Sequence, residues 1–317
     1  MMNYFFESSN YNPWQNLATE KHLAENIQPG DLLLYLWQNE NTVVIGRNQN
    51  ALRECKTQLL ESEGGYLARR TTGGGAVYHD LGNLCFTFAA SPERYDLERQ
   101  MRVVQRACRK FGIDTEFSGR NDIITKDGYK FSGNAFSVTT QCKIQHGTLM
   151  IDVNKEKLGR YLTPSEEKMK ATGVKSVASR VCNLKELCPQ VTVDAMKEAL
   201  KEAFEEEYGP FQTCTQDGLS SEKIEEFCQE YASWDWRYGK SPECEVVHSK
   251  RFSWGEVQLH LKLKNLYIEE CKVYSDALDV ELPLQIEKLL VQKRYDMDQV
   301  EAERSELQDV ITWLAQV

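Results

Sequence analysis

The spacing of apolar residues along the chain predicts helices and strands in mixed order. Apolar residues recur every three or four positions from Leu97 to Phe111, which predicts a helix over residues 95–111 that packs on a sheet. Because helices and strands intermix rather than alternate strictly, we expect an α+β fold. Further helices are predicted from Pro13 and at 192–208 and 222–231, and strands at 32–37, 42–45, 65–68 and 84–88.

The pattern changes near Ser241, where we expect a domain boundary. Beyond it, one predicted strand alternates apolar with polar residues, as in a hairpin with one buried face, and Lys264-Asn265 forms the turn. The sequence therefore predicts a larger domain of residues 1–241 and a small α+β domain of residues 250–317. The elements expected in the small domain are strands at 257–263 and 268–274 and helices at 284–293 and 299–315.

The segment between the strands at 65–68 and 84–88 carries the strongest chemical signal. Residues 69–83 read Arg-Arg-Thr-Thr-Gly-Gly-Gly-Ala-Val-Tyr-His-Asp-Leu-Gly-Asn. Three consecutive glycines lose much backbone freedom on folding and add no packing, so some contact must offset the loss. Bare N–H groups can cradle phosphate oxygens, and arginine can grip phosphate or carboxylate. An ordinary hairpin turn rarely needs three glycines, and neither a dinucleotide-binding nor a Walker pattern is present, so we predict an anion-binding loop.

A second cluster follows at a predicted hairpin. Asp127-Gly128 is a strong turn signal, so residues 123–125 and 129–131 should pair as antiparallel strands, with Lys130 at the start of the returning strand. Small residues follow the lysine and leave room for a ligand. A lone lysine beside a turn is usually a solvated charge, so its interpretation depends on the neighbouring motifs.

Composition and charge narrow the class of protein. The chain has 317 residues and a net charge of −10, which argues against a nucleic-acid partner. It contains no run of 18 or more apolar residues and no signal or transit pattern, so we expect a cytoplasmic protein without a membrane partner. Ten cysteines without a Cys-x-x-Cys pair indicate reduced thiols rather than disulfides or a zinc site.

With both clusters in view, the chain resembles the lipoate–protein ligase family. The motifs occur in the family's order and span nearly the whole chain. They lie at residues 69–83, 119–122 (Gly-Arg-Asn-Asp), 130–135 (Lys-x-Ser-Gly-x-Ala), 146–149 (His-Gly-Thr-Leu) and 175–184 (Lys-Ser-x-x-Ser-Arg-Val-x-Asn-Leu), with further similarity at 13–18, 42–47 and 234–242.

The resemblance implies the biotin/lipoyl protein ligase fold, with a mixed, largely antiparallel sheet flanked by helices. It also implies a reaction in two steps. Lipoate and ATP, with Mg²⁺, would give lipoyl-AMP and pyrophosphate, and an acceptor lysine would then attack the mixed anhydride. The implied acceptors are lipoyl domains of 2-oxoacid dehydrogenase E2 subunits and the glycine cleavage H protein. Residues 1–241 would form the catalytic domain and residues 250–317 an accessory domain, whose presence favours a complete ligase.

The same resemblance assigns the site residues. Lys130 would be catalytic and touch both the lipoyl carbonyl and the phosphate, as a compact point charge can. Asn121 and Asp122 would contact the adenylate or Mg²⁺, although an Asx turn explains them equally well. No fixed metal site made of protein ligands alone is expected. The implied ATP-binding residues are Arg70, Gly75, Ala76, Val77, Tyr78 and Lys130, and the implied lipoate-binding residues are Gly74, Lys130 and, unless they are satisfied structural groups, His79 and His146.

Alternatives stay open at this point. An acyltransferase of the same fold would move octanoate or lipoate through a thioester, and Cys182 is its candidate nucleophile, with Arg180 nearby to lower the thiol pKa. We expect Cys182 to be structural instead. A protein that binds the adenylate without turnover is a third possibility. Biotin ligases share the fold, and a dithiolane tail and an octanoyl chain both ask for an apolar tunnel, so substrate class rests on the motifs.

Overall fold

The computed structural model describes residues 1–118, 121–163, 181–239, 244–275, 277, 279 and 281–317. The chain divides into two compact units. The larger unit comprises Met1–Arg47 and Leu52–Ser233, and the smaller comprises Asn48–Ala51 and Trp234–Val317. The expected boundary at Ser241 lies outside the described residues, and the catalytic and accessory roles of the two domains stay predictions.

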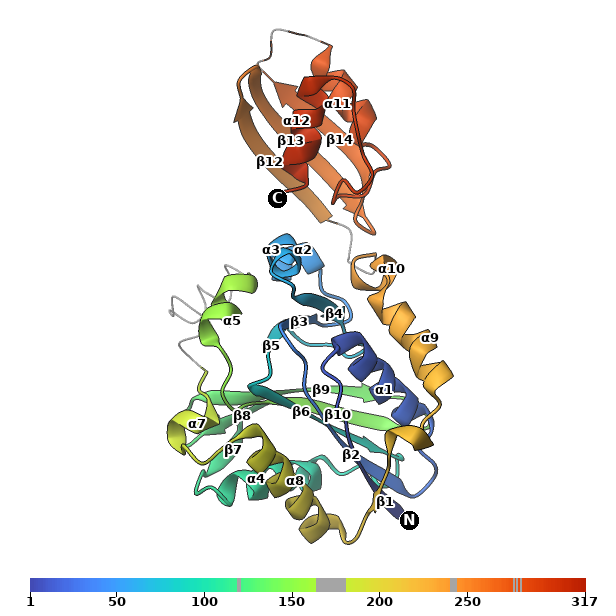
Figure 1. Cartoon of the computed structure of the whole chain (residues 1–317), viewed down its shortest axis with the longest axis vertical. Helices are drawn as coiled ribbons and strands as arrows, with labels where there is room; N and C mark the ends of the chain where they lie inside the picture. Colours follow the sequence, from blue (N-terminus) through green and yellow to red (C-terminus); the bar gives the residue numbers. More distant parts are fainter. Residues whose placement is uncertain (119–120, 164–180, 240–243, 276, 278, 280) are drawn as a thin grey trace. The chain divides into compact units, whose positions relative to one another are not determined.

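Within the described residues, the larger unit is built on an eight-stranded sheet (Figure 1). Strand β1 pairs in parallel with both β2 and β11, whereas all neighbours from β2 to β7 are antiparallel. The expected mixed, largely antiparallel sheet is therefore confirmed. In spatial order the strands are β11 (Gln212–Thr213), β1 (Met2–Glu7), β2 (Asp31–Trp37), β6 (Asn83–Ala90), β10 (Lys143–Met150), β9 (Lys130–Val138), β8 (Asp122–Thr125) and β7 (Thr115–Ser118).

Helices α4 (Leu97–Arg109) and α8 (Val193–Tyr208) cover one face of this sheet (Figure 1). Helix α4 begins two residues after its predicted start and α8 one residue after. Each begins there because the side chains of Asp96 and Thr192 accept hydrogen bonds from N–H groups of the first helical turn. Their apolar faces pack with β6 into the main core. This packing fixes β6 and its neighbour β10, which carry part of the candidate site.

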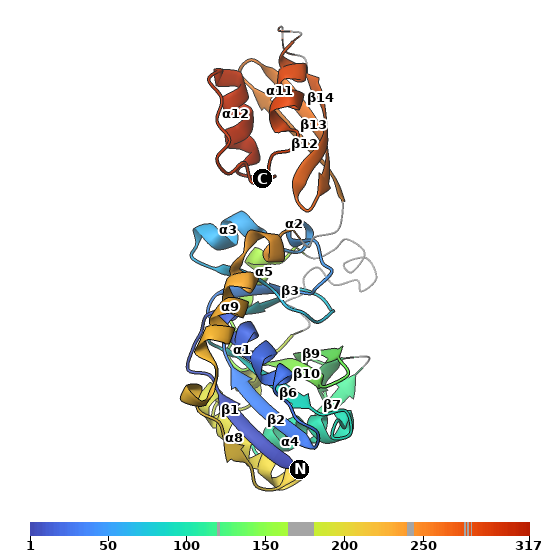
Figure 2. The same cartoon turned by 90° about the vertical axis from the view of Figure 1, so that its right-hand side faces the viewer.

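The opposite side of the sheet carries a second layer (Figure 2). Helices α1 (Pro13–Glu25) and α9 (Ser221–Ala232) pack against each other there. In the part of the chain that is described, this layer also holds a three-stranded sheet in the order β4-β3-β5. Its strands are β4 (Tyr66–Arg69), which is parallel to β3 (Thr42–Ile45), and β5 (Val77–His79), which is antiparallel to β3.

Because β4 and β5 flank β3, the glycine-rich segment between them must cross the end of β3. The shorter helices of the chain complete the fold, and none of the helices in the described ranges is long and apolar enough to cross a membrane. The shorter elements are α2 (Ala51–Glu54), α3 (Thr57–Ser62), α5 (Lys155–Tyr161), α7 (Leu184–Leu187), α10 (Trp234–Arg237) and the 3-10 helix η2 (Gln216–Gly218).

The smaller unit contains an antiparallel sheet of β12 (Cys244–Phe252), β13 (Gly255–Lys264) and β14 (Tyr267–Ser275). The predicted hairpin is confirmed in β13 and β14, and the alternating apolar residues of β13 are buried under α11 (Leu282–Leu290) and α12 (Ser305–Leu314). Strand β12 was not expected from the sequence.

The helix predictions at 284–293 and 299–315 are wrong at one end each. Helix α11 ends at Leu290, and Gln292 has a φ of 64°, in the left-handed region that a helix cannot contain. Helix α12 begins only at Ser305, because Met297 and Gln299 both have a φ of 58°. The apolar spacing continues through these turns although the backbone does not.

Candidate active site

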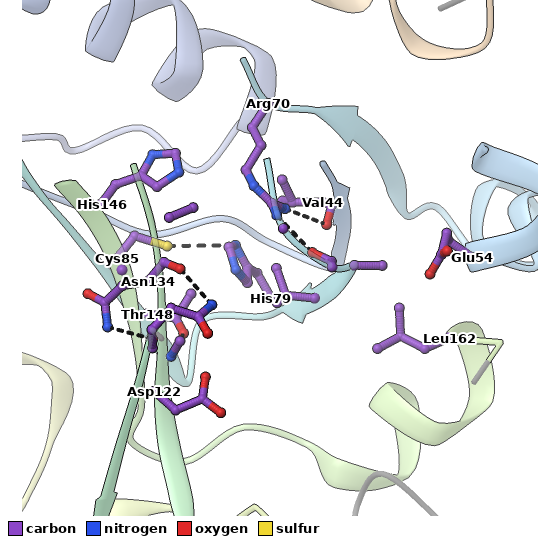
Figure 3. A pocket seen from close by; sticks show the side chains of 18 of the residues that line it. Val44, Glu54, Arg70, His79, Cys85, Asp122, Asn134, His146, Thr148 and Leu162 are labelled. Atoms are coloured by element: carbon purple, nitrogen blue, oxygen red, sulfur yellow. Dashed lines mark hydrogen bonds between the residues drawn. The ribbon is translucent and has the colours of Figure 1, made fainter. Parts of the chain in front are cut away.

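A cavity of about 340 Å³ lies between the three-stranded sheet and strands β8, β9 and β10 of the large sheet. Leu17, Trp37 and Cys85 form an apolar part of its wall. Figure 3 shows His146 and Cys85 at one end and Glu54 and Leu162 at the other. Most of the residues singled out in the sequence line this one cavity, namely Arg70, Gly74, Gly75, Ala76, Val77, His79, Asn121, Asp122, Lys130 and His146.

The glycine segment closes as a loop around Arg70. Arg70 is only 7% exposed, and its Nη2 donates hydrogen bonds to the carbonyls of Gly73 at 2.7 Å and Gly75 at 2.8 Å. Its Nη1 donates to the carbonyl of Val44 at 3.3 Å. These acceptors are neutral, so an anion that enters the cavity can replace them with stronger, charge-assisted partners.

Two glycines are required by close approach of the backbone. Gly74 has a φ of 95°, which side chains rarely tolerate. A Cβ on Gly46 would lie 2.2 Å from the carbonyl oxygen of Gly74. The end of β3 and the glycine loop are therefore in direct backbone contact, and only glycine fits between them.

Arg69 has a different place from Arg70. It is fully buried at the end of β4 and donates hydrogen bonds to the carbonyls of Gly46 at 3.3 Å and Arg47 at 2.9 Å. Burial lowers its pKa to about 10. Arg69 does not appear among the residues that line the cavity, so it holds the backbone beside the loop in position.

Lys130 begins strand β9, as the hairpin signal predicted. Its ammonium lies 2.7 Å from the carboxylate of Asp122 on β8. A Cβ on Gly133 would lie 3.2 Å from the Lys130 Nζ, so the side chain of Lys130 rests over that glycine. The lysine is thereby directed across the sheet into the cavity by the carboxylate on one side and by the space above Gly133 on the other.

Asn121 and Tyr78 use their side chains to hold the structure together. Asn121 Nδ2 donates to the carbonyl of Asn134 at 2.9 Å, and Asn134 Nδ2 donates back to the carbonyl of Asn121 at 3.1 Å. The hydroxyl of Tyr78 donates to Asn41 at 3.0 Å, and Tyr78 does not appear among the lining residues. Their ligand contacts stay predictions.

His79 is buried and neutral. Burial is the main reason that its pKa is lowered to about 3, and the charge of Arg70 adds to the shift. Its Nδ1 lies 3.2 Å from the amide nitrogen of Asn39 and 3.6 Å from the thiol of Cys85. Because Asn39 donates to Nδ1, the other ring nitrogen carries the hydrogen, and within the described part of the chain that Nε2 has no hydrogen-bond partner.

His146 lies in a buried hydrogen-bonded chain that the sequence analysis missed. Its Nδ1 donates to Glu20 at 2.8 Å, and its Nε2 lies 2.8 Å from the hydroxyl of Thr72. Burial pushes the pKa of Glu20 upward, but His146, Thr87 and Arg70 outweigh it and bring that pKa below its usual value. The sequence does contain a signal for this buried group, because Glu20 lies between Leu17 and Ala24 on the apolar face of α1.

Comparison with known proteins identifies the family. Residues 12–205 match the lipoyl protein ligase A/B catalytic domain, and residues 241–312 match the bacterial lipoate protein ligase C-terminus. A lipoate-protein ligase A of Psychrobacter cryohalolentis is 41% identical over 305 residues, which cover 93% of this chain and 90% of that protein. The chain belongs to the lipoate–protein ligase family.

Several solved ligase structures resemble this chain in fold. P. falciparum LipL1 in complex with lipoate is 28% identical, with a TM-score of 0.65, and the match covers 99% of this chain and 100% of that chain. A bipartite lipoate protein ligase of Thermoplasma acidophilum, studied with its E2 lipoyl domain, is 27% identical with a TM-score of 0.65, covering 78% and 100%. A lipoate-protein ligase A bound with ATP is 25% identical with a TM-score of 0.62, covering 75% and 98%.

Cys182 of the ligase lies in the apolar core and not in the cavity wall. Burial is the main cause that raises its thiol pKa, and the charge of Glu186 raises it further. Its backbone N–H donates to the carbonyl of Lys130 at 3.0 Å, so this segment supports the start of strand β9. Arg180 and the motif residues Gly119, Arg120 and 175–180 of the ligase lie outside the described residues.

Proposed function

We propose that this lipoate–protein ligase joins free lipoate to carrier lysines through lipoyl-AMP, with Lys130 as the catalytic group. One observation carries the proposal. Lys130, Arg70 and the loop from Gly74 to Val77 line a single cavity whose wall also contains the apolar side chains of Leu17 and Trp37. Such a cavity offers an apolar site for an acyl chain beside fixed donors for phosphate.

The first step brings two anions together, because the lipoate carboxylate must attack the α-phosphate of ATP. Positive charge and preorganised N–H donors lower that barrier. Lys130 is the group that reaches both the acyl carbonyl and the α-phosphate. Arg70 and the backbone of Gly74, Gly75, Ala76 and Val77 hold the phosphates, and His79 and His146 border the acyl chain. Tyr78 would act through its backbone.

Mg²⁺ fits this donor set through one carboxylate. Asp122 presents oxygen atoms to the cavity, and Mg²⁺ commonly binds one or two carboxylates while phosphates and water complete its shell. Within the described ranges no cluster of three or more His, Cys, Asp or Glu side chains forms a metal site. When bound, the ion would neutralise phosphate charge, and Asn121 would order the adenylate beside it.

In the second step the acceptor amine attacks the lipoyl carbonyl, and AMP leaves. The related T. acidophilum ligase was studied with an E2 lipoyl domain, which supports lipoyl domains as the acceptors here. We propose E2 lipoyl domains and the glycine cleavage H protein. Residues 1–241 would carry both steps of the chemistry, and residues 250–317 would assist adenylation.

A thioester route has no support at Cys182, its candidate nucleophile, or at Cys85, which lines the cavity. The thiol pKa values of Cys85 and Cys182 are both raised, chiefly by burial, which disfavours the thiolate that such a route requires.

The test is an assay with ATP, Mg²⁺, lipoate and an isolated lipoyl domain. We expect pyrophosphate release and a lipoyl adduct on one lysine, detected by mass spectrometry. Acylation that proceeds without ATP from an octanoyl carrier would favour the transferase instead, and adenylate binding without pyrophosphate release would indicate a binding protein.

A further inference from the structure

We propose that Thr72 and Glu20 are positioning residues, which couple the acyl end of the cavity to Arg70 of the glycine loop through one buried hydrogen-bonded chain. The inference rests on the proposed function, because it takes Arg70 as a phosphate ligand and His146 as a neighbour of the acyl chain. Neither Thr72 nor Glu20 needs to touch a substrate for this role.

This hydrogen-bonded relay joins four side chains from three separate parts of the sequence. Arg70 Nε donates to Thr72 Oγ1 at 3.0 Å, Thr72 Oγ1 lies 2.8 Å from His146 Nε2, and His146 Nδ1 lies 2.8 Å from Glu20 Oε1. All four residues are buried, with exposures of 7%, 2%, 7% and 4% in that order. Hydrogen bonds in such an environment meet little competition from water.

The direction of each hydrogen bond follows from the chemistry of the groups. An ionised carboxylate only accepts, so His146 Nδ1 donates to Glu20. Thr72 accepts from Arg70 and keeps its own hydroxyl hydrogen for His146 Nε2. Every donor therefore points from the cation of Arg70 toward the anion of Glu20. A second arm ends on the same carboxylate, since Trp37 Nε1 donates to Thr87 Oγ1 at 3.1 Å and Thr87 donates to Glu20 at 2.6 Å.

This arrangement keeps Arg70 charged without placing a carboxylate in direct contact with its guanidinium. Burial lowers the pKa of Arg70 to about 10, and the charge of Glu20 opposes that shift. A direct carboxylate pair would occupy the guanidinium fork that an anion needs. Here Thr72 fixes only the Nε edge, while Nη2 donates to the neutral carbonyls of Gly73 and Gly75. The relay thus supplies a counter-charge and leaves the phosphate-binding edge exchangeable.

The same relay connects the proposed lipoate site with the proposed ATP site. His146 lines the cavity beside Gly147 and Ala135, and Thr72 lies within the loop that carries Gly74 and Gly75. An acyl chain that fixes the His146 ring also fixes Thr72 and therefore Arg70. We expect lipoate to tighten binding of the ATP phosphates by at least about 5-fold, the lower end of usual coupling between sites.

The coupling is measured by calorimetry with the full chain and the ATP analogue whose α–β bridge is methylene, with and without lipoate. The parent should bind the analogue at least about 5-fold tighter with lipoate present. Thr72→Val keeps the shape of the side chain but removes the hydroxyl, and should reduce the coupling below about 2-fold. Thr72→Ser restores the hydroxyl and should restore the coupling.

Thr42→Val is the matched control. Thr42 is also fully buried, and its hydroxyl donates to the Glu40 carbonyl at 2.5 Å, but it does not belong to the relay or to the cavity wall. This variant should keep the coupling of the parent. Glu20→Met provides a second test if Thr72→Val does not fold, because at similar size it removes both the oxygen that accepts from His146 and the counter-charge. It should lose the coupling and also weaken analogue binding without lipoate.

Coupling that persists in folded Thr72→Val or in folded Glu20→Met overturns the inference, and so does the absence of coupling in the parent protein. The proposed function fails by a different readout, since a parent that shows the coupling but releases no pyrophosphate from ATP and lipoate would not be a ligase. A parent that does not bind the analogue at all would overturn both.

Discussion

The ammonium of Lys130 and the carboxylate of Asp122 lie 2.7 Å apart across the hairpin of β8 and β9. The side chains are 38% and 34% exposed, respectively, so water screens the pair and it adds little to stability. The ion pair matters because it holds the Lys130 side chain in position. The register of the hairpin places Asp122 opposite Gly133, so the carboxylate sits where it can hold the lysine over the bare glycine backbone.

Replacement of Lys130 by alanine should leave the fold intact and slow lipoyl-AMP formation by at least about 10²-fold, the usual loss for one preorganised charge at a reacting centre. ATP–pyrophosphate exchange measures the effect, and circular dichroism checks the fold. Asp122→Asn gives the matched comparison, since it keeps the lysine but releases it. It should cause a smaller loss of about 10-fold. Near-normal exchange in folded Lys130→Ala would remove Lys130 from its catalytic role.

The contact between Gly46 and Gly74 predicts a strong effect of one methyl group. In Gly46→Ala the new Cβ would lie 2.2 Å from the Gly74 carbonyl, so the glycine loop must move. We expect the KM for ATP to rise by about 10-fold or more, with a smaller change in the KM for lipoate. Gly159→Ala on α5 is the control, because no atom lies within 4 Å of a Cβ there. Equal KM values for ATP in both variants would show that the loop tolerates the displacement.

Cys182→Ser should keep most of the ligation rate. A phosphate anhydride needs no protein nucleophile, and the buried thiol has a raised pKa. A modest loss of stability is expected from placing a hydroxyl in the apolar core. Initial rates of lipoyl-domain modification test this. A hydroxylamine-labile acyl adduct on Cys182, together with an inactive serine variant, would establish the transferase mechanism.

His79 should make the protein less stable in mild acid. In the unfolded chain a histidine has a pKa of about 6.5, whereas the pKa of His79 in the folded protein is lowered to about 3. Between these values the unfolded chain binds a proton that the folded chain does not, so the free energy of unfolding falls as the pH falls. The loss from this one group reaches about 2 kcal/mol by pH 5.

Urea unfolding at pH 7.5 and pH 5 measures this contribution. His79→Gln cannot titrate, so its free energy of unfolding should decline by about 2 kcal/mol less than that of the parent over the same range. The other titrating groups are common to both proteins. An equal decline in parent and variant would show that His79 takes up its proton as readily in the folded state as in the unfolded state.

A chain of residues 1–239 should fold, because the larger unit has its own core. We expect it to transfer the lipoyl group from added lipoyl-AMP more efficiently than it forms lipoyl-AMP from ATP, because site closure assists the first step most. The two half-reactions, measured separately for both lengths of chain, provide the test. Equal adenylation rates in the full chain and in residues 1–239 would show that the C-terminal residues have another role.

Sequence was most informative where a function or a backbone shape depends on adjacent residues. The triple glycine and its arginines, the Asp127-Gly128 turn and the lysine that follows it are local features, and local sterics decide them. They were enough to predict the hairpin, the loop and the family. The helix predicted over residues 95–111 was equally clear, since its apolar stripe lies within one segment.

Only the tertiary structure decided which of these features share a site and how. Two adjacent arginines have different surroundings, because Arg69 at the end of β4 bonds to the carbonyls that follow β3, while the loop returns over Arg70. Glu20, Thr72 and His146 are distant in sequence and meet only when α1, the glycine loop and β10 pack together. A sequence fixes spacing along the chain, but a hydrogen bond depends on distances of about 3 Å in space, which long-range packing alone determines.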